Sequence, residues 1–333
     1  RFAPAPLDAA ERGALASRDL AAAPPAVRAD CPDWCVPFAE EAFGAGWVSE
    51  LAALAARPPL DLRVNTLAAA PQKVLAALED ADAAPAGMLD EAIRIPAIQG
   101  GGRHPNVQAA AAFRDGWFEV QDLGSQIAAA LAGAQGGMQV LDYCAGAGGK
   151  TLAMASAMDN RGQIFAHDAE KQRLAPIFER LRRAGARNVQ AIAGPDGLAA
   201  LAGRMDLVLV DAPCTGSGTW RRRPDAKWRL TQRQLDVRIA EQGAILADAA
   251  RHVRPGGRLV YVTCSIFPAE NARRIEAFLN ENPAFSAADH DALWRARFGD
   301  VRASARIDAG GIVLTPATTG TDGFFVAVLR RSA

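Results

Sequence analysis

The chain has 333 residues, half of them hydrophobic, which is enough to bury a full core and favours two domains. Lysine plus arginine and aspartate plus glutamate total 37 each, so no global field points to a polyanionic partner. Five widely spaced cysteines do not make a secreted disulfide framework, and no apolar stretch reaches the roughly 18 residues needed to span a bilayer. These features predict a cytoplasmic protein with reduced thiols.

Residues 1–57 predict a segment of short helices, because alanine and arginine recur at helical spacing between proline breaks such as Pro24-Pro25. The arginine at position 1 is consistent with an upstream domain that this chain does not contain. Cys31 and Cys35 have no second Cys or His pair nearby, so no metal site is expected.

Residues 58–115 predict a small α+β module. LDLRVNTL, after Pro58-Pro59, is typical of a strand, and PQKVLAALEDA is typical of a helix that begins at Pro71. Two further apolar stretches, 93–98 and 107–113, complete the module.

From Gly116 onward, strand and helix patterns alternate. The predicted strands are 139–143, 163–167, 189–193, 206–210 and 258–263, and the predicted helices are 150–158, 170–184, 197–202, 232–253 and 269–280. Runs that are apolar on both faces, such as LVLV and LVYV, are typical of a parallel sheet covered on both sides. The pattern predicts a doubly wound α/β domain, closed by an antiparallel pair of strands at 312–315 and 324–329.

A glycine loop follows the first of these strands, in LDYCAGAGGKT. A phosphate-binding Walker loop would need glycine at the position of Cys144, and a dinucleotide fingerprint would need glycine at the position of Thr151. Gly146, Gly148 and Gly149 therefore indicate a nucleoside cofactor without a pyrophosphate.

Two aspartates follow the next two strands. Asp168 stands 20 residues beyond Gly148, where an acid can accept hydrogen bonds from ribose hydroxyls, and Asp196 is placed to meet the adenine edge. Each alone is more often a helix cap or turn residue. Together with the glycine loop they indicate S-adenosylmethionine.

Two cysteines end strand-like runs, Cys214 in MDLVLVDAPC and Cys264 in GRLVYVTCS. Neighbouring parallel strands lie about 4.8 Å apart, so both thiols would reach one edge of the sheet. Paired thiols beside a cofactor loop indicate covalent chemistry, although a buried cysteine is often only a small hydrophobe. Sequence order does not assign their separate roles.

A basic segment runs from Arg221 to Arg238 beside Cys214. The residues predicted to hold RNA phosphates are Arg221, Arg222, Arg223 and Lys227. Trp220 and Trp228 are available for base stacking or for packing. The alternative for the whole segment is a solvated charged face.

These motifs, in this order and spacing, resemble the RsmB/NOL1/NOP2/Sun family of RNA cytosine-5 methyltransferases. The matching segments are LRVNTL, VQDLGSQ, LDYCAGAGGKT, DAPCTGSGT, RRRPDAKW, VTCS and DGFFVAVL, which span residues 58 to 330. The resemblance implies a class I methyltransferase fold, Rossmann-like and mostly parallel, over residues 116–333, after a helical and α+β N-terminal region. Gly146 and Ala147 depart from the alanine and proline that are common in the family.

The resemblance also implies site residues. The cofactor site would be lined by Cys144, Ala145, Gly146, Ala147, Gly148, Gly149, Lys150, Asp168, Asp196 and Asp211. Cys264 would be the nucleophile that adds to carbon 6 of cytosine, and Cys214 would assist product release. Asp211 would hydrogen-bond the cytosine ring.

The function expected is that of a monomeric enzyme forming 5-methylcytosine in an exposed loop or flipped nucleotide of RNA, with ribosomal favoured over transfer RNA. The small module would supply further RNA contacts. Two alternatives stay open. The first is a catalytically silent RNA-binding assembly factor, although the retention of both cysteines argues against it. The second is a DNA cytosine-5 methyltransferase, because Pro213-Cys214 resembles the Pro-Cys pair that holds the nucleophile in those enzymes.

Overall fold

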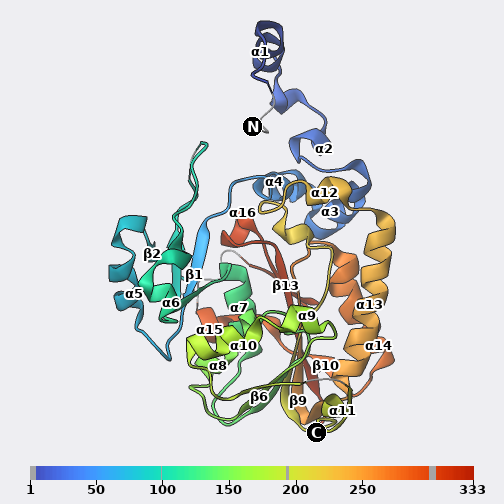
Figure 1. Ribbon diagram of the computed structural model, residues 1–333. Coiled ribbons are helices and arrows are strands. Elements are labelled where there is room, and N and C mark those ends of the chain that lie inside the picture. Colours follow the sequence, from blue (N-terminus) through green and yellow to red (C-terminus); the bar gives the residue numbers. More distant parts are fainter. Residues whose placement is uncertain (1–4, 99, 193–194, 300–304) are drawn as a thin grey trace.

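The computed structural model describes residues 5–98, 100–192, 195–299 and 305–333 (Figure 1). The described residues form two sheets, a four-stranded antiparallel sheet ordered β2-β3-β1-β4 and a nine-stranded mixed sheet ordered β11-β12-β13-β9-β8-β5-β6-β7, with β10 beside β13. Within those ranges, no helix combines the length and the apolar character needed to cross a membrane.

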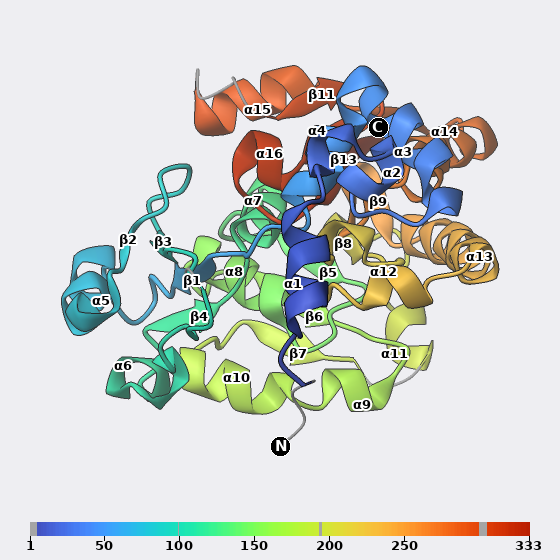
Figure 2. The same cartoon turned by 90° about the horizontal axis from the view of Figure 1, so that it is seen from above.

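The N-terminal segment is helical, as predicted. Its helices are α1 (Ala9–Ala16), α2 (Pro25–Arg28), α3 (Val36–Phe43) and α4 (Trp47–Ala53). The aromatic and aliphatic side chains of α3 and α4 share a buried cluster with Trp220 and Phe267 of the large domain. Figures 1 and 2 both place α4 against α16. Helices α3 and α4 are therefore part of the large domain's core, whereas α1 and α2 have no buried residues.

The small module is a sheet with two short helices at its side. Its elements are β1 (Leu60–Val64), α5 (Pro71–Ala77), β2 (Ala84–Pro85), β3 (Ala92–Ile95), α6 (Ala111–Arg114) and β4 (Phe118–Val120). Because β4 pairs antiparallel with β1, with Leu62 opposite Val120, the sheet continues past the predicted boundary at residue 115. The stretch 107–113, which was expected to complete the module, is helical in part, with a 3-10 turn at Val107–Ala109 followed by the start of α6.

The large sheet contains all the predicted strands, together with β10 and β11, which were not predicted; residue 193 of the predicted strand 189–193 lies outside the described residues. Its strands are β5 (Gln139–Asp142), β6 (Gln163–Ala166), β7 (Val189–Ala191), β8 (Met205–Asp211), β9 (Val253–Thr263), β10 (Phe285–Ala287), β11 (Arg306–Asp308), β12 (Gly311–Leu314) and β13 (Phe324–Arg331). Strands β9, β8, β5, β6 and β7 are parallel. The predicted antiparallel pair, β12 and β13, extends this sheet because β13 also pairs antiparallel with β9.

Helices cover both faces of the large sheet. They are α7 (Leu123–Ala132), α8 (Gly149–Ala157), α9 (Lys171–Leu174), α10 (Ile177–Ala184), α11 (Pro195–Ala199), α12 (Ala226–Arg229), α13 (Gln232–Ala250), α14 (Ala272–Glu281), α15 (His290–Phe298) and α16 (Pro316–Thr319). Side chains of α7, α8 and α15 pack in one core cluster, and those of α11, α13 and α14 pack in another. The domain is doubly wound, as predicted.

Two helical predictions need correction. The single helix expected over 170–184 is two helices, α9 and α10, because Pro176 between them lacks an N–H and its ring crowds the preceding turn. Helix α7 was not predicted, although its signals are local: Asp122 caps it by accepting a hydrogen bond from the Gly124 N–H (2.7 Å), and Gly133 ends it in the left-handed conformation (φ 68°).

Candidate active site

The two cysteines meet at the carboxyl ends of neighbouring strands. Strands β8 and β9 are parallel and adjacent, with Asp211 opposite Val262. The Sγ atoms of Cys214 and Cys264 lie 3.4 Å apart, both side chains are half-buried, and neither is in a disulfide. The sequence prediction that both thiols reach one edge of the sheet is confirmed.

The two thiols differ in their surroundings. The contact with Cys264, followed by burial, raises the pKa of Cys214 well above its ordinary value. Cys214 therefore stays a thiol, in direct contact with the Cys264 sulfur.

The glycine loop, residues 144–149, leads from β5 into α8, and the backbone conformation of its glycines determines its shape. Gly148 has φ of 83°, and a Cβ there would come within 2.6 Å of the Ile177 side chain. The Gly146 N–H (φ 52°) donates to Asp168 Oδ2 (3.0 Å). The first N–H groups of α8 lack intrahelical acceptors, so they face the loop as donors for a ligand carboxylate.

Asp168 is fixed at the end of β6. It is buried, and its Oδ1 accepts a hydrogen bond from the Glu170 N–H (2.9 Å) while Oδ2 accepts from Gly146. Each carboxylate oxygen keeps a further lone pair, which suits ribose hydroxyls. A cavity of about 650 Å³ opens beside Asp168, with apolar walls that include Phe178 and Leu198. This donor and acceptor set fits an adenosyl group.

Two other residues predicted to line the cofactor site are Cys144 and Asp196. Burial raises the pKa of Cys144, so this third thiol near the loop stays protonated. The side chain of Asp196, in α11, lies outside what the structure describes.

A second, polar cavity of about 300 Å³ lies between the glycine loop and the small module. Lys150 Nζ and Asp211 Oδ2 form an ion pair across it at 2.6 Å, and the Asp211 side chain remains 35% exposed. Gln121 and Ser125 form its opposite wall, joined by a 3.0 Å hydrogen bond. Charged side chains from the end of β8 and from α8 therefore line a cavity that the end of the small module also borders.

Sequence reasoning missed Asp142, which also borders this cavity. It is 1% exposed, its Oδ2 accepts a hydrogen bond from Thr151 Oγ1 (2.6 Å), and its Oδ1 has no partner within the described ranges. Burial raises the pKa of Asp142 to about 7. An acid that ends an apolar strand directly before a glycine loop was the available signal.

Sequence reasoning also missed Glu270, in the 3-10 turn Pro268–Glu270 that follows Cys264. Its carboxylate is fully buried and accepts hydrogen bonds from residues beside each cysteine. The nearest of these donors in sequence, Ser265, is five residues away and the farthest, Thr215, is 55. No local pattern links them.

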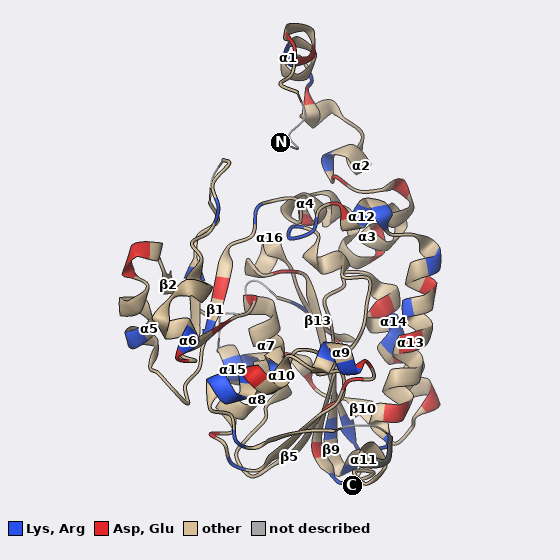
Figure 3. Ribbon diagram, in the orientation of Figure 1, with Lys and Arg blue, Asp and Glu red and all other residues tan. Residues whose placement is uncertain are grey.

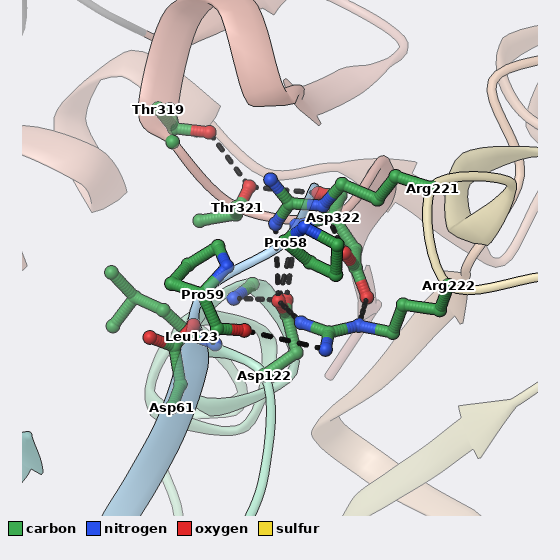
Figure 4. Close-up of polar contacts among 12 residues, drawn as sticks. Pro58, Pro59, Asp61, Asp122, Leu123, Arg221, Arg222, Thr319, Thr321 and Asp322 are labelled. Carbon is green, nitrogen blue, oxygen red and sulfur yellow. Dashed lines mark hydrogen bonds and ion pairs between the residues drawn. The ribbon is translucent and has the colours of Figure 1, made fainter. Parts of the chain in front are cut away.

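The predicted phosphate-binding cluster is largely engaged inside the protein, and this prediction requires correction. Figure 4 shows Arg221 and Arg222 bridging Asp122 and Asp322; Arg221 Nε lies 2.5 Å from Asp322 Oδ1 and its side chain is 4% exposed. Arg222 Nη2 lies 2.8 Å from Asp122 Oδ2. These arginines join the Cys214 side of the domain to the start of α7 and to the chain before β13.

Lys227 is likewise buried, with a side chain 3% exposed and an ion pair to Asp30. Trp220 is buried in the core, whereas Trp228 is 59% exposed. Of the four predicted phosphate contacts, Arg223 is exposed and Arg222 partly so. Figure 3 shows basic and acidic residues interleaved along α13.

Comparisons with known proteins identify the family of the chain. A family model described as 16S rRNA methyltransferase RsmB/F matches residues 128–330, and a model for an RsmF/B-like ferredoxin-like domain matches residues 31–98. The chain belongs to the RsmB/F methyltransferase family. S-adenosylmethionine is the cofactor of this family, which confirms the cofactor prediction.

Curated relatives carry the name ribosomal RNA small subunit methyltransferase B. The chain is 31% identical over 307 residues to a probable one from Synechocystis sp., covering 90% of this chain and 67% of the relative, and 33% identical over 309 residues to one from Enterobacter sp., covering 90% and 66%. Among the curated relatives compared, the chain spans between 57% and 67% of their length.

Solved structures share the fold. The crystal structure of NSun6 from Pyrococcus horikoshii is 21% identical, with a TM-score of 0.78, over 91% of this chain and 99% of that one. A methyltransferase homologue from the same organism is 23% identical, with a TM-score of 0.74, over 92% and 97%. At these identities the likeness concerns the RsmB/F fold alone.

Proposed function

We propose that this protein is an RNA methyltransferase that forms 5-methylcytosine in small-subunit ribosomal RNA through a covalent enzyme–cytosine adduct. The observation that carries the proposal is the 3.4 Å contact between the Cys214 and Cys264 sulfurs, at the ends of β8 and β9 and one strand away from the glycine loop after β5. Membership of the RsmB/F family supports the RNA substrate.

Carbon 5 of cytosine is a poor nucleophile until another group adds to the ring. The Cys264 thiolate attacks carbon 6, forming a C–S bond and moving the electron pair of the 5,6 double bond to carbon 5. S-adenosylmethionine, when bound, supplies the methyl group that carbon 5 takes. Cys264 is taken as the attacking thiol because the family resemblance gives it that role, and because the raised pKa of Cys214 keeps that neighbouring thiol protonated.

Product release requires the proton on carbon 5 to leave. Cys214, or a water that Cys214 orients, takes this proton once the Cys264 sulfur is bound to carbon 6, because the contact that most raises the Cys214 pKa is then lost. The electron pair of the broken C–H bond restores the double bond and expels the Cys264 thiolate. The two cysteines therefore act one after the other: Cys264 attacks the ring, and Cys214 then assists release of the product.

Asp211 and Lys150 border the reaction from the glycine-loop side. The exposed part of the Asp211 carboxylate accepts a hydrogen bond from the cytosine amino group, which orients the ring. The Lys150 ammonium, 2.6 Å from Asp211, offsets negative charge that develops on the ring during attack.

A cavity of about 270 Å³ gives the target nucleotide a route to Cys214 from the α13 side. Its walls include Arg233 and Arg238 together with Thr215. An unstacked or flipped nucleotide fits this geometry, whereas a base inside a duplex does not reach it.

The test is methyl transfer from labelled S-adenosylmethionine to separate RNA and DNA pools, followed by bisulfite mapping of ribosomal RNA in cells with and without the gene. We expect label in RNA and one or a few cytosines whose modification depends on the gene. Absence of transfer to either pool would favour a silent assembly factor, and transfer to DNA alone would overturn the proposal in favour of a DNA enzyme.

A further inference from the structure

Glu270 accepts four hydrogen bonds from neutral donors. Oε1 accepts from the Thr215 N–H (2.8 Å) and from Gln242 Nε2 (3.0 Å). Oε2 accepts from Thr215 Oγ1 (2.5 Å) and from Ser265 Oγ (2.5 Å). Both carboxylate oxygens therefore act as acceptors, each for two donors.

These donors belong to the two segments that carry the thiols. Thr215 follows Cys214 directly, and Ser265 follows Cys264 directly. Gln242, on α13, donates through the same amide nitrogen to the Pro213 carbonyl (2.9 Å), immediately before Cys214. The Glu270 carboxylate therefore connects both cysteine segments to each other and to α13.

Further hydrogen bonds tie the two segments together around this point. Ser217 Oγ lies 2.9 Å from Ser265 Oγ, and the Gly218 N–H donates to the Cys264 carbonyl (3.0 Å). The Cys214–Cys264 separation is thus set by a buried polar network in which Glu270 is the charged member. A displacement of such groups by about 1 Å is enough to cost roughly 10²-fold in rate.

The charge of Glu270 is not neutralised by a cation, since no lysine, arginine or histidine within the described ranges forms an ion pair with it. Its field acts on the nearest titratable groups. The Glu270 charge contributes to the raised pKa of Cys214, after the larger effects of the Cys264 contact and burial.

We propose that Glu270 is a positioning residue that holds Cys214 and Cys264 in one fixed arrangement and, by its negative charge, makes the two thiols chemically unequal. The catalytic meaning of this inequality rests on the proposed function. The arrangement itself is a property of the protein alone, so it is measurable without RNA.

The test compares Glu270→Gln, which keeps the size and removes the charge, with Glu270→Asp, which keeps the charge and shortens the reach. Alkylation of each cysteine is followed against pH by mass spectrometry, without RNA. We expect the Cys214 midpoint to fall by about one pH unit in Glu270→Gln and to stay in place in Glu270→Asp. The matched control is Glu276→Gln, an exposed glutamate on α14.

Methyl transfer gives the second measurement. Both Glu270 variants are expected to lower kcat by roughly 10-fold to 100-fold while the Kd for S-adenosylmethionine stays within about twofold, since the glycine loop is untouched. An unchanged Cys214 profile in Glu270→Gln would overturn the charge effect. Absence of methyl transfer by the wild-type protein would instead contradict the proposed function, but it would not affect the alkylation result, which is obtained without RNA.

Should Glu270→Gln fail to bind cofactor, Thr215→Val takes its place, because it removes one hydrogen bond and keeps the charge. The measurement is then the rate at which the oxidant diamide joins Cys214 to Cys264 as a disulfide, diamide being reduced to the hydrazine. We expect about a tenfold slower closure in Thr215→Val than in the wild type, as the thiols separate. An equal rate would show that Glu270 does not set their spacing.

Discussion

The glycine loop after β5 and the cysteine segments after β8 and β9 stand at the same edge of one sheet, yet they are held in place differently. The loop is fixed by its own backbone, with left-handed glycines and the Gly146 N–H bound to Asp168. The cysteine segments are fixed by buried side chains that converge on Glu270. A loop that binds through its backbone needs small residues, whereas a pair of reacting thiols needs a rigid surround.

The difference predicts which changes affect chemistry and which affect binding. Substitutions in the cysteine segments should act on the covalent steps with cofactor affinity intact. Substitutions around the glycine loop should act on cofactor affinity and on stability.

The largest effect is expected for Cys264→Ala. Without a thiolate to add to carbon 6, carbon 5 is not activated, and the rate should fall roughly 10³-fold or more, with no covalent adduct on denaturing gels. Cofactor affinity measured by calorimetry should be unchanged. Cys31→Ala, in the buried cluster that α3 and α4 share with Phe267, is the matched control and should still form the adduct.

Cys214→Ala should stop the cycle one step later. The attack by Cys264 remains possible, but the proton on carbon 5 is removed slowly, so a covalent RNA adduct should accumulate on denaturing gels. The reverse pattern, with adduct in Cys264→Ala and none in Cys214→Ala, would show that the two roles are exchanged.

Asp168→Ala should weaken S-adenosylmethionine binding. The substitution removes the acceptor for ribose hydroxyls and releases the Gly146 N–H, a loss of about 1.5–3 kcal/mol that corresponds to roughly 10-fold to 100-fold in Kd by calorimetry. Asp236→Ala, exposed on α13, is the control. Equal affinity in Asp168→Ala would remove this residue from the cofactor site.

The smallest effect is a pH dependence from Asp142. Its pKa is raised from 3.8 to about 7, so between these values the folded state holds a proton that the unfolded state has lost. The stability that this proton provides is complete below about pH 4 and is lost as pH rises through 7.

Asp142→Asn should therefore be more stable than the wild type at pH 8, with the difference vanishing near pH 4, in urea unfolding without cofactor. Asp80→Asn, on the exposed surface of the small module, should show no such trend. A wild type and variant that respond identically to pH would contradict the assignment.

Much of the fold followed from local patterns. Apolar runs on β8 and β9 predicted the neighbouring strands, and the glycine loop was predicted from residues within one short segment. Cys214 and Cys264 were predicted to meet because parallel strands end at one edge of a sheet. Each of these inferences needed only the periodicity of one or two elements.

The errors involve partners far apart in the chain. Arg221 and Arg222 were expected to contact phosphates, but their acidic partner Asp322 stands about 100 residues away. Lys227 pairs with Asp30 across 197 residues. A charge run has the same sequence whether it faces solvent or a buried acid, so its burial was not accessible to pattern reasoning.

The packing of α3 and α4 has a practical consequence for protein engineering. Trp34 and Phe38 lie with ring centroids 6.3 Å and 5.3 Å from that of Phe267, which stands three residues after Cys264. The Phe267 ring centroid also lies 5.9 Å from that of Trp220. An expression boundary placed at residue 58 would uncover these rings, so a minimal catalytic fragment has to start upstream of Cys31.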